Sequence, residues 1–125
     1  MNADQPPLPT ILVLASGSGT NLQALINASR ERDFPGQIVA VGCNRPGAFA
    51  LERAAQANID TFTVDHTHYG SREEFDGALM AEIRRHNPDL IVLAGFMRIL
   101  TTDFVRALRG TMLNVHPSLL PKYIR

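Results

Sequence analysis

The sequence has little of several features that define whole classes of protein. It holds a single cysteine, Cys43, which cannot form a disulfide bond within the chain. It contains no run of about 18 apolar residues, so we expect no membrane-spanning helix. The chain carries 12 basic and 12 acidic residues, which leaves no surplus of positive charge to neutralise a nucleic-acid backbone. The sequence therefore predicts neither a membrane partner nor a nucleic-acid partner.

The remaining composition is that of an ordinary globular protein. Hydrophobic residues make up 45% of the 125 positions, and this length fits one domain. The first residues include neither a basic stretch nor an apolar one, so we expect no secretory signal. We predict a flexible, proline-rich leader over residues 1–9 and one domain over residues 10–125, in a cytoplasmic protein.

Short apolar runs alternate with helical patterns along the chain. The apolar runs predict five strands, at residues 11–15, 38–41, 61–64, 90–94 and 111–115. Four helices are expected between them: one capped by Thr20 or Asn21, one over residues 48–57, one capped by Ser71 and ended by Asn87-Pro88, and a short one capped by Thr102.

This alternation predicts the α/β class, with a doubly wound, mostly parallel sheet of Rossmann-like type. Right-handed crossovers place the strands in the order 3-2-1-4-5. The winding direction then reverses between the strands at 11–15 and 90–94, and ligands bind beyond the carboxyl ends of strands at such a point. We therefore expect a site between loops 16–20 and 95–100.

The loop Ser16-Gly17-Ser18-Gly19-Thr20-Asn21 leads from a strand into a helix. Its backbone N–H groups and the positive end of the helix dipole suit an anion, and phosphate is the natural ligand. No Gly-Lys-Ser/Thr follows, so the loop is not a Walker A motif. A dinucleotide site is disfavoured because Leu22 replaces the third glycine, and because Asn44 and Arg45 stand where an acidic residue would bind ribose. The alternative is that the glycines serve only the turn.

Asn114 and His116 are two residues apart on a predicted strand, so their side chains leave the same face. The following Pro117 favours extended backbone at His116 and holds the pair at the end of the strand. An amide can donate a hydrogen bond to a developing oxyanion, and an imidazole can move a proton, so the pair suits acyl transfer. The alternative is an exposed histidine beside a loop asparagine.

Other candidate residues carry weaker signals. His66 and His68 lack a third ligand, so we expect surface-loop residues and no metal site. Cys43 ends an apolar strand and is expected in the core. Arg72 lies in the first turn of a helix, where a basic residue opposes the helix dipole and so has another reason to be present. An ordinary solvated surface arginine is the alternative.

Three motifs together carry a family resemblance. They are LASGSGTNLQ at 14–23, LAGFMRIL at 93–100 and LNVHPSLLPKY at 113–123. With this order, the chain resembles the phosphoribosylglycinamide formyltransferase family of purine biosynthesis over about residues 10 to 123. The resemblance implies transfer of a formyl group from 10-formyltetrahydrofolate to the amine of glycinamide ribonucleotide, with no metal.

The resemblance also implies roles for residues that match the family's motifs. It places the substrate phosphate on Gly19, Thr20 and Asn21. Asn114 is similar to the amide that polarises the carbonyl and contacts the folate, and His116 is similar to the catalytic acid or base. The positions that match folate contacts are Arg72, Met97, Arg98, Ile99, Leu100 and Asn114.

The family pattern continues beyond the third motif, with further strands, a second folate-binding stretch and an aspartate that raises the pKa of the histidine. Here the sequence stops at Arg125. We therefore expect a C-terminally truncated formyltransferase N-terminal domain with impaired activity. The predicted last strand would then leave an apolar edge that favours pairing with another chain, as in a homo-oligomer.

Two other functions fit parts of the pattern. One is a ribonucleotide-phosphate binding fragment without catalysis, because the phosphate loop is intact while the proton-transfer apparatus is incomplete. The other is a different folate-dependent enzyme, a deformylase or an initiator-tRNA formyltransferase, because these share similar Asn-x-His machinery. The loop at 16–21 suits a small phosphorylated substrate, and the neutral net charge disfavours tRNA.

Overall fold

A computed structural model describes residues 7–96, 98 and 100–115 of the chain. Its strands are β1 (Thr10–Ala15), β2 (Gln37–Cys43), β3 (Asp60–Thr63), β4 (Leu90–Ala94) and β5 (Met112–Asn114). Its helices are α1 (Thr20–Ser29), α2 (Phe49–Gln56), α3 (Arg72–His86) and α4 (Thr102–Ala107), with a 3-10 turn, η1 (His66–His68). The predicted leader lies largely outside the described residues; Pro7, Leu8 and Pro9 are exposed.

The strands form one parallel sheet in the order β3-β2-β1-β4-β5, which confirms the predicted class and order. The central strand is β1, because every residue of its run Ile11–Ala15 is apolar and buried. Every connection between strands that are neighbours in sequence includes a helix, as parallel pairing requires. The carboxyl ends of all five strands therefore meet at one edge of the sheet.

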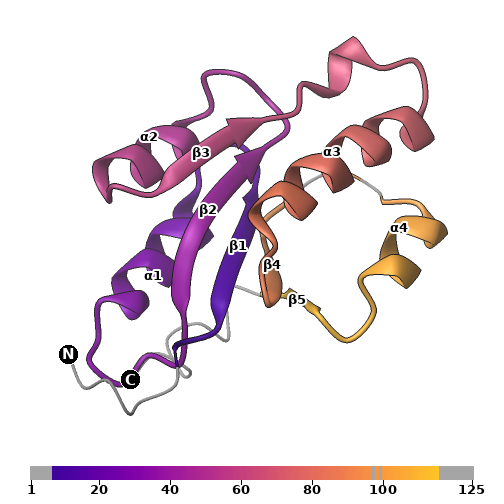
Figure 1. Cartoon of the computed structure of the whole chain (residues 1–125). Coiled ribbons are helices and arrows are strands. Elements are labelled where there is room, and N and C mark those ends of the chain that lie inside the picture. The colour runs from indigo at the N-terminus through magenta and orange to yellow at the C-terminus, as the bar shows by residue number, and fades with distance from the viewer. Residues whose placement is uncertain (1–6, 97, 99, 116–125) are drawn as a thin grey trace.

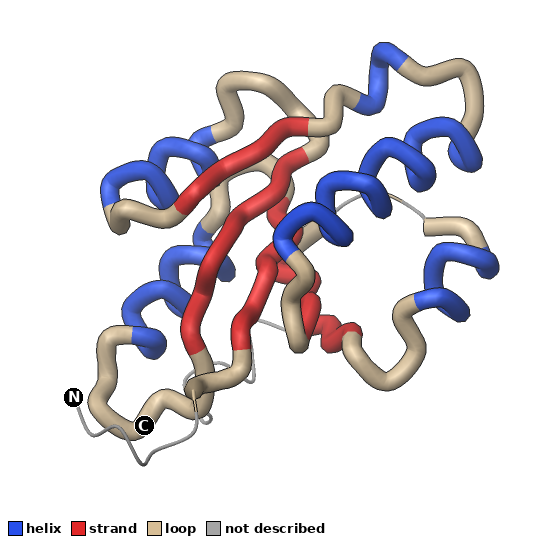
Figure 2. The backbone as a smooth tube through the Cα atoms, in the orientation of Figure 1, coloured by secondary structure: helices blue, strands red, loops and turns tan. Residues whose placement is uncertain are grey.

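Helices cover both faces of this sheet. Figure 1 shows α1 and α2 on one face and α3 and α4 on the other, and Figure 2 shows the sheet between these two layers. The alternation of side chains along β1 supplies both cores: Val13 and Ala15 pack with α1, while Leu12 and Leu14 pack with α3.

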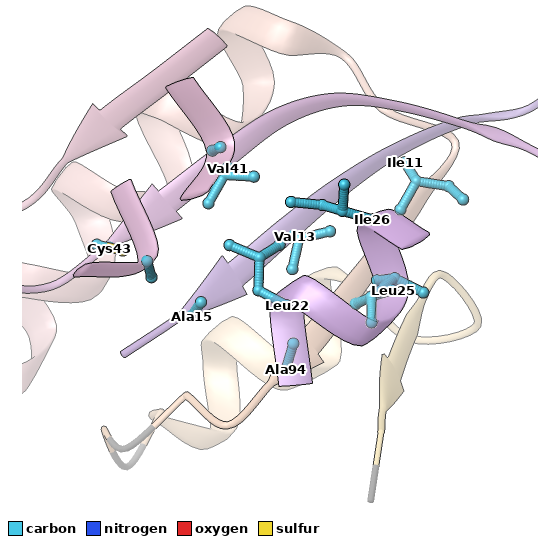
Figure 3. Close-up of a cluster of buried hydrophobic side chains, with 12 residues drawn as sticks. Ile11, Val13, Ala15, Leu22, Leu25, Ile26, Val41, Cys43 and Ala94 are labelled. Carbon is cyan, nitrogen blue, oxygen red and sulfur yellow. The ribbon is translucent and has the colours of Figure 1, made fainter. Parts of the chain in front are cut away.

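The core beneath α1 is made by the apolar stripe that the sequence predicts on that helix. Leu22 and Ile26 are almost fully buried, and in Figure 3 they lie against Val13 of β1. Burial of side chains of this size stabilises the fold by about 1.5 to 3 kcal/mol each. This packing fixes the start of α1, and with it the glycine loop, above the carboxyl edge of β1.

The helix caps were predicted with mixed success. The hydroxyl of Ser71 caps α3 by accepting from the Glu74 backbone N–H at 3.2 Å, which confirms that prediction. The prediction for α1 was wrong, because Gly19 is the N-cap and no side chain caps this helix. The prediction for α4 was wrong by one residue, since the hydroxyl of Thr101 and not of Thr102 accepts from Phe104 N–H.

Element boundaries differ from the predictions by one or two residues. The second strand is longer than predicted, reaching Cys43, because its pairing with β1 continues to that residue. The last strand is shorter than the predicted range 111–115 and pairs with β4 alone. Within the described part of the chain, no helix combines the length and apolar character needed to cross a membrane.

Candidate functional site

A cleft of about 350 Å³ lies at the carboxyl edge of the sheet, where the winding direction reverses. It brings together the two predicted loops, those after β1 and β4. The loops after β2 and β3 complete it. The lining residues are Ser16, Gly17, Ser18, Gly19, Thr20, Asn21, Asn44, Arg45, His66, Ala94, Gly95 and Arg98. This volume is at the lower end of the range for small-molecule sites, roughly 300 to 1,000 Å³.

The backbone of the glycine loop is oriented by contacts with α2. The carbonyl of Gly17 accepts from the Ala50 backbone N–H at 3.2 Å, and the carbonyl of Ser18 accepts from Arg53 Nε at 2.7 Å. In a trans peptide the N–H points opposite to the carbonyl. The N–H groups of Ser18 and Gly19 therefore point away from α2.

The first turn of α1 adds further donors to this loop. The carbonyl of Gly19 accepts the first helical hydrogen bond, from Gln23 N–H at 2.8 Å. The N–H groups at the start of a helix have no intrahelical partner and carry the positive end of the dipole. Thr20 and Asn21 occupy this turn and line the cleft. The loop has the geometry of an anion-binding helix N-terminus.

Arg53 supports the loop from outside the cleft. Besides its bond to Ser18, it donates from an NH1 nitrogen to the Gln23 side chain at 3.2 Å. Its guanidinium lies 4.6 Å from the centre of the Phe49 ring. Sequence reasoning missed this residue, because it is 35 positions from Ser18 and stands in an unremarkable helical pattern.

The side of the cleft formed by the loops after β2 and β3 is organised by Asn44. This residue is only 4% exposed, and its side-chain oxygen accepts from Ser16 Oγ at 2.8 Å. Its backbone carbonyl lies 2.9 Å from Nδ1 of His66, which is half-buried. The prediction that His66 is merely a surface-loop residue was therefore wrong. The predicted strand order could have revealed this role, because it places the loops after β2 and β3 next to the loop after β1 at the carboxyl edge of the sheet.

The charge of the cleft favours an anion. Arg45 and Arg98 line it together with His66, and none of the described residues that line it is acidic. The guanidinium of Arg98 lies 5.7 Å from the centre of the Phe75 ring on α3, and its Nε is buried without a hydrogen-bond partner. Cationic groups and backbone N–H donors therefore meet in one small cleft.

Gly95, the residue that follows β4, packs against the glycine loop. Its φ is +72°, and a Cβ atom there would stand 3.3 Å from Asn21 Nδ2. The Asn21 amide therefore lies against the backbone of the loop after β4, which explains how both predicted loops contribute to one cleft.

A family model described as formyl transferase matches residues 10–124 of the chain. The chain belongs to the formyl transferase family. Phosphoribosylglycinamide formyltransferase of Escherichia coli is 51% identical over 113 residues, which cover 90% of this chain and 53% of that protein. Trifunctional purine biosynthetic protein adenosine-3 of Chironomus tentans is 51% identical over 119 residues, 94% of this chain and 9% of that protein.

Solved structures of formyl transferases share the fold. Phosphoribosylglycinamide formyltransferase of Coxiella burnetii, in complex with CHES, superposes with a TM-score of 0.83 at 49% identity, covering 94% of this chain and 55% of that one. The enzyme of Brucella melitensis also gives 0.83, at 38% identity, covering 91% of this chain and 59% of that one. The chain thus spans about half the length of the single-function formyl transferases that it matches.

Three of the described residues that were predicted to contact folate lie outside the cleft. Arg72 is exposed as the first residue of α3, and Leu100 packs on the core beneath α3 and α4. Asn114 is exposed at the end of β5, in register with Leu93 of β4. Of the members of this set that the structure describes, Arg98 lines the cleft and Arg72, Leu100 and Asn114 do not. The predicted residues Met97, Ile99 and His116 lie outside the described residues.

The remaining chemical candidates, Cys43 and His68, lie outside the cleft. Cys43 is 1% exposed, and burial raises the pKa of its thiol to about 11, so the thiol stays protonated at neutral pH. This confirms Cys43 as a core residue. His68 is exposed and lies 3.4 Å from Asp65, outside the cleft. No cluster of three metal-ligating side chains occurs among the residues that the structure describes.

Proposed function

We propose that the protein transfers a formyl group from 10-formyltetrahydrofolate to the amine of glycinamide ribonucleotide, in purine biosynthesis in the cytoplasm. The observation that carries the proposal is the cleft itself. There a glycine loop, whose Ser18 and Gly19 N–H groups point away from α2, meets Arg45 and Arg98, and none of the described lining residues is acidic. The names of the relatives supply the reaction.

In this proposal Gly19, Thr20 and Asn21 hold the phosphate of the ribonucleotide. The cleft, at about 350 Å³, suits a ligand the size of a phosphorylated pentose. A folate placed beside it would lie along the α3 and α4 side of the same edge, where Arg72, Leu100 and Asn114 are found. Met97, Arg98 and Ile99 complete the proposed folate contacts.

The proposed chemistry is direct acyl transfer. The substrate amine forms a bond to the formyl carbon, and the bond from that carbon to the folate nitrogen breaks. Asn114 donates a hydrogen bond to the formyl oxygen as it gains negative charge, an interaction that typically contributes about 3 kcal/mol. His116 takes the proton lost by the amine and delivers it to the departing nitrogen. A covalent enzyme intermediate is not required.

Binding tests the phosphate half of this proposal. Calorimetric titration of the chain should give an affinity for glycinamide ribonucleotide at least about tenfold above that for the same compound without its phosphate. Equal affinities would overturn the placement of the phosphate on the glycine loop.

Catalysis is tested with the chain and with a version extended to the length of its Escherichia coli relative. Replacing His116 with Ala in the extended version should lower kcat for formyl transfer by about 100-fold or more. The matched control is His68→Ala, since His68 lies outside the cleft. Binding without turnover in both forms would support the alternative of a phosphate-binding module.

A further inference from the structure

The loops after β2 and β3 bring two basic residues to the cleft. Arg45 is exposed and His66 is half-buried, and both line the cleft that contains the glycine loop. We refer to these two residues as the cationic wall. Neither belongs to the residues that the family resemblance assigns to phosphate or folate.

The orientation of the His66 ring follows from one hydrogen bond. Its Nδ1 lies 2.9 Å from the Asn44 carbonyl oxygen, and a carbonyl only accepts, so Nδ1 carries a hydrogen. The Asn44 side-chain nitrogen lies 3.5 Å from the same Nδ1 and cannot donate to a nitrogen that already carries a hydrogen. The ring is left with Nε2 as its remaining polar atom.

His66 is supported by a buried, hydrogen-bonded asparagine. Asn44 is 4% exposed, and its side chain is held by Ser16 Oγ from the loop after β1. The backbone N–H of His66 also reaches the Asn44 carbonyl, at 3.3 Å. The loop after β3 is therefore tied to the end of β2.

We propose that Arg45 and His66 form a second anion-binding wall, which holds the phosphate of the ligand from the side formed by the loops after β2 and β3. The inference rests on the proposed function, because it takes a phosphate monoester as the ligand. A phosphate dianion only accepts hydrogen bonds. His66 can therefore contact it only with a hydrogen on Nε2, which requires the charged ring because Nδ1 is already occupied.

The charged groups around His66 come from several elements. Asp65 and His68 belong to the same turn, where the Thr67 hydroxyl and backbone N–H lower the pKa of Asp65 and thereby keep its negative charge near the ring. Arg45, from the loop after β2, and Arg98, from the loop after β4, share the cleft. One carboxylate and two guanidinium groups therefore surround the place where the phosphate would bind.

Titration of the full chain with ribose 5-phosphate, at several pH values, tests the wall. The ratio of wild-type affinity to that of His66→Gln should be about tenfold near pH 6 and should approach one near pH 8.5, because glutamine cannot gain a charge. Ionisation of the ligand's phosphate affects wild type and variant equally, so its effect on affinity cancels in this ratio. Arg45→Gln should weaken binding about tenfold at every pH and reduce its dependence on salt.

Matched controls are available in the same chain. His68→Gln removes a neighbouring histidine outside the cleft, and Arg32→Gln removes an exposed arginine outside it. Both should bind as the wild type does. Far-ultraviolet circular dichroism and a thermal midpoint show whether each variant is folded, and the exposed Arg45 remains informative if His66→Gln is not.

The outcomes separate this inference from the proposed function. If the wild type binds ribose 5-phosphate no better than ribose, the phosphate site of the proposed function fails, and the wall fails with it. If the phosphate binds but the two wall variants behave like His68→Gln and Arg32→Gln at every pH, the wall alone is overturned.

Discussion

Gly17 and Gly19 differ in the space that the structure leaves for a side chain. Both have a left-handed φ, +63° and +73°, but a Cβ at Gly17 meets nothing within 4 Å, whereas one at Gly19 would stand 2.7 Å from the Ala50 Cα. We expect Gly17→Ala to lower the free energy of unfolding by about 1 kcal/mol, from backbone strain alone. Gly19→Ala should cost about 2 kcal/mol more, because helix α2 must move. Urea denaturation of the two variants measures the difference.

Equal losses for the two alanine variants would contradict the close approach of α2 to the loop. The same approach explains why the cap of α1 could not be predicted. The side chains of Thr20 and Asn21 are good caps by local preference. Gly19 takes the cap position because Ala50, 31 residues later, packs too closely for any side chain. A contact at that separation leaves no sign in the local sequence.

At the scale of elements, α3 holds the start of α4 through one buried carboxylate. Asp76 is 4% exposed, and its Oδ2 accepts from the Thr101 backbone N–H at 2.7 Å, while its Oδ1 is buried without a partner. Asp76→Ala should lower the free energy of unfolding by about 2 kcal/mol, because it leaves the half-buried Thr101 N–H without its acceptor. Asp76→Asn keeps an acceptor for Thr101, so its loss should be smaller. Chemical denaturation of both variants provides the comparison.

The Asp76 link also bears on the cleft, because Thr101 follows the loop that carries Arg98. Affinity for ribose 5-phosphate should therefore fall in Asp76→Ala and be largely restored in Asp76→Asn. Similar affinity in both variants, at similar stability, would show that the carboxylate serves packing alone. Asp103 is an exposed control on the first turn of α4. Asp103→Ala should change neither the affinity for ribose 5-phosphate nor the free energy of unfolding appreciably.

At the scale of the whole molecule, the strand order was predictable because crossover handedness leaves few arrangements of alternating strands and helices. The loops after β1 and β4 were predictable for the same reason. Asn44, Arg45 and His66 were not recognised, because their role depends on three loop ends meeting in space and on hydrogen bonds between backbone and side chain. Arg53 was also missed, because it supports the loop by donating to the Ser18 carbonyl and belongs to no recognisable motif.

The described sheet ends at β5, an edge strand in which Leu113 has 55% of its surface exposed. A strand edge with an exposed apolar side chain is a template for pairing with a second chain. We expect the chain to self-associate as its concentration rises, and Leu113→Lys to shift it towards the monomer, because a charge there would have to be buried in the paired state. Sedimentation velocity at several concentrations measures the shift. Val105→Lys is the control, since Val105 is 44% exposed but lies on α4. A wild-type chain that stays monomeric at about 100 μM, or an equal effect of both lysines, would contradict association through this edge.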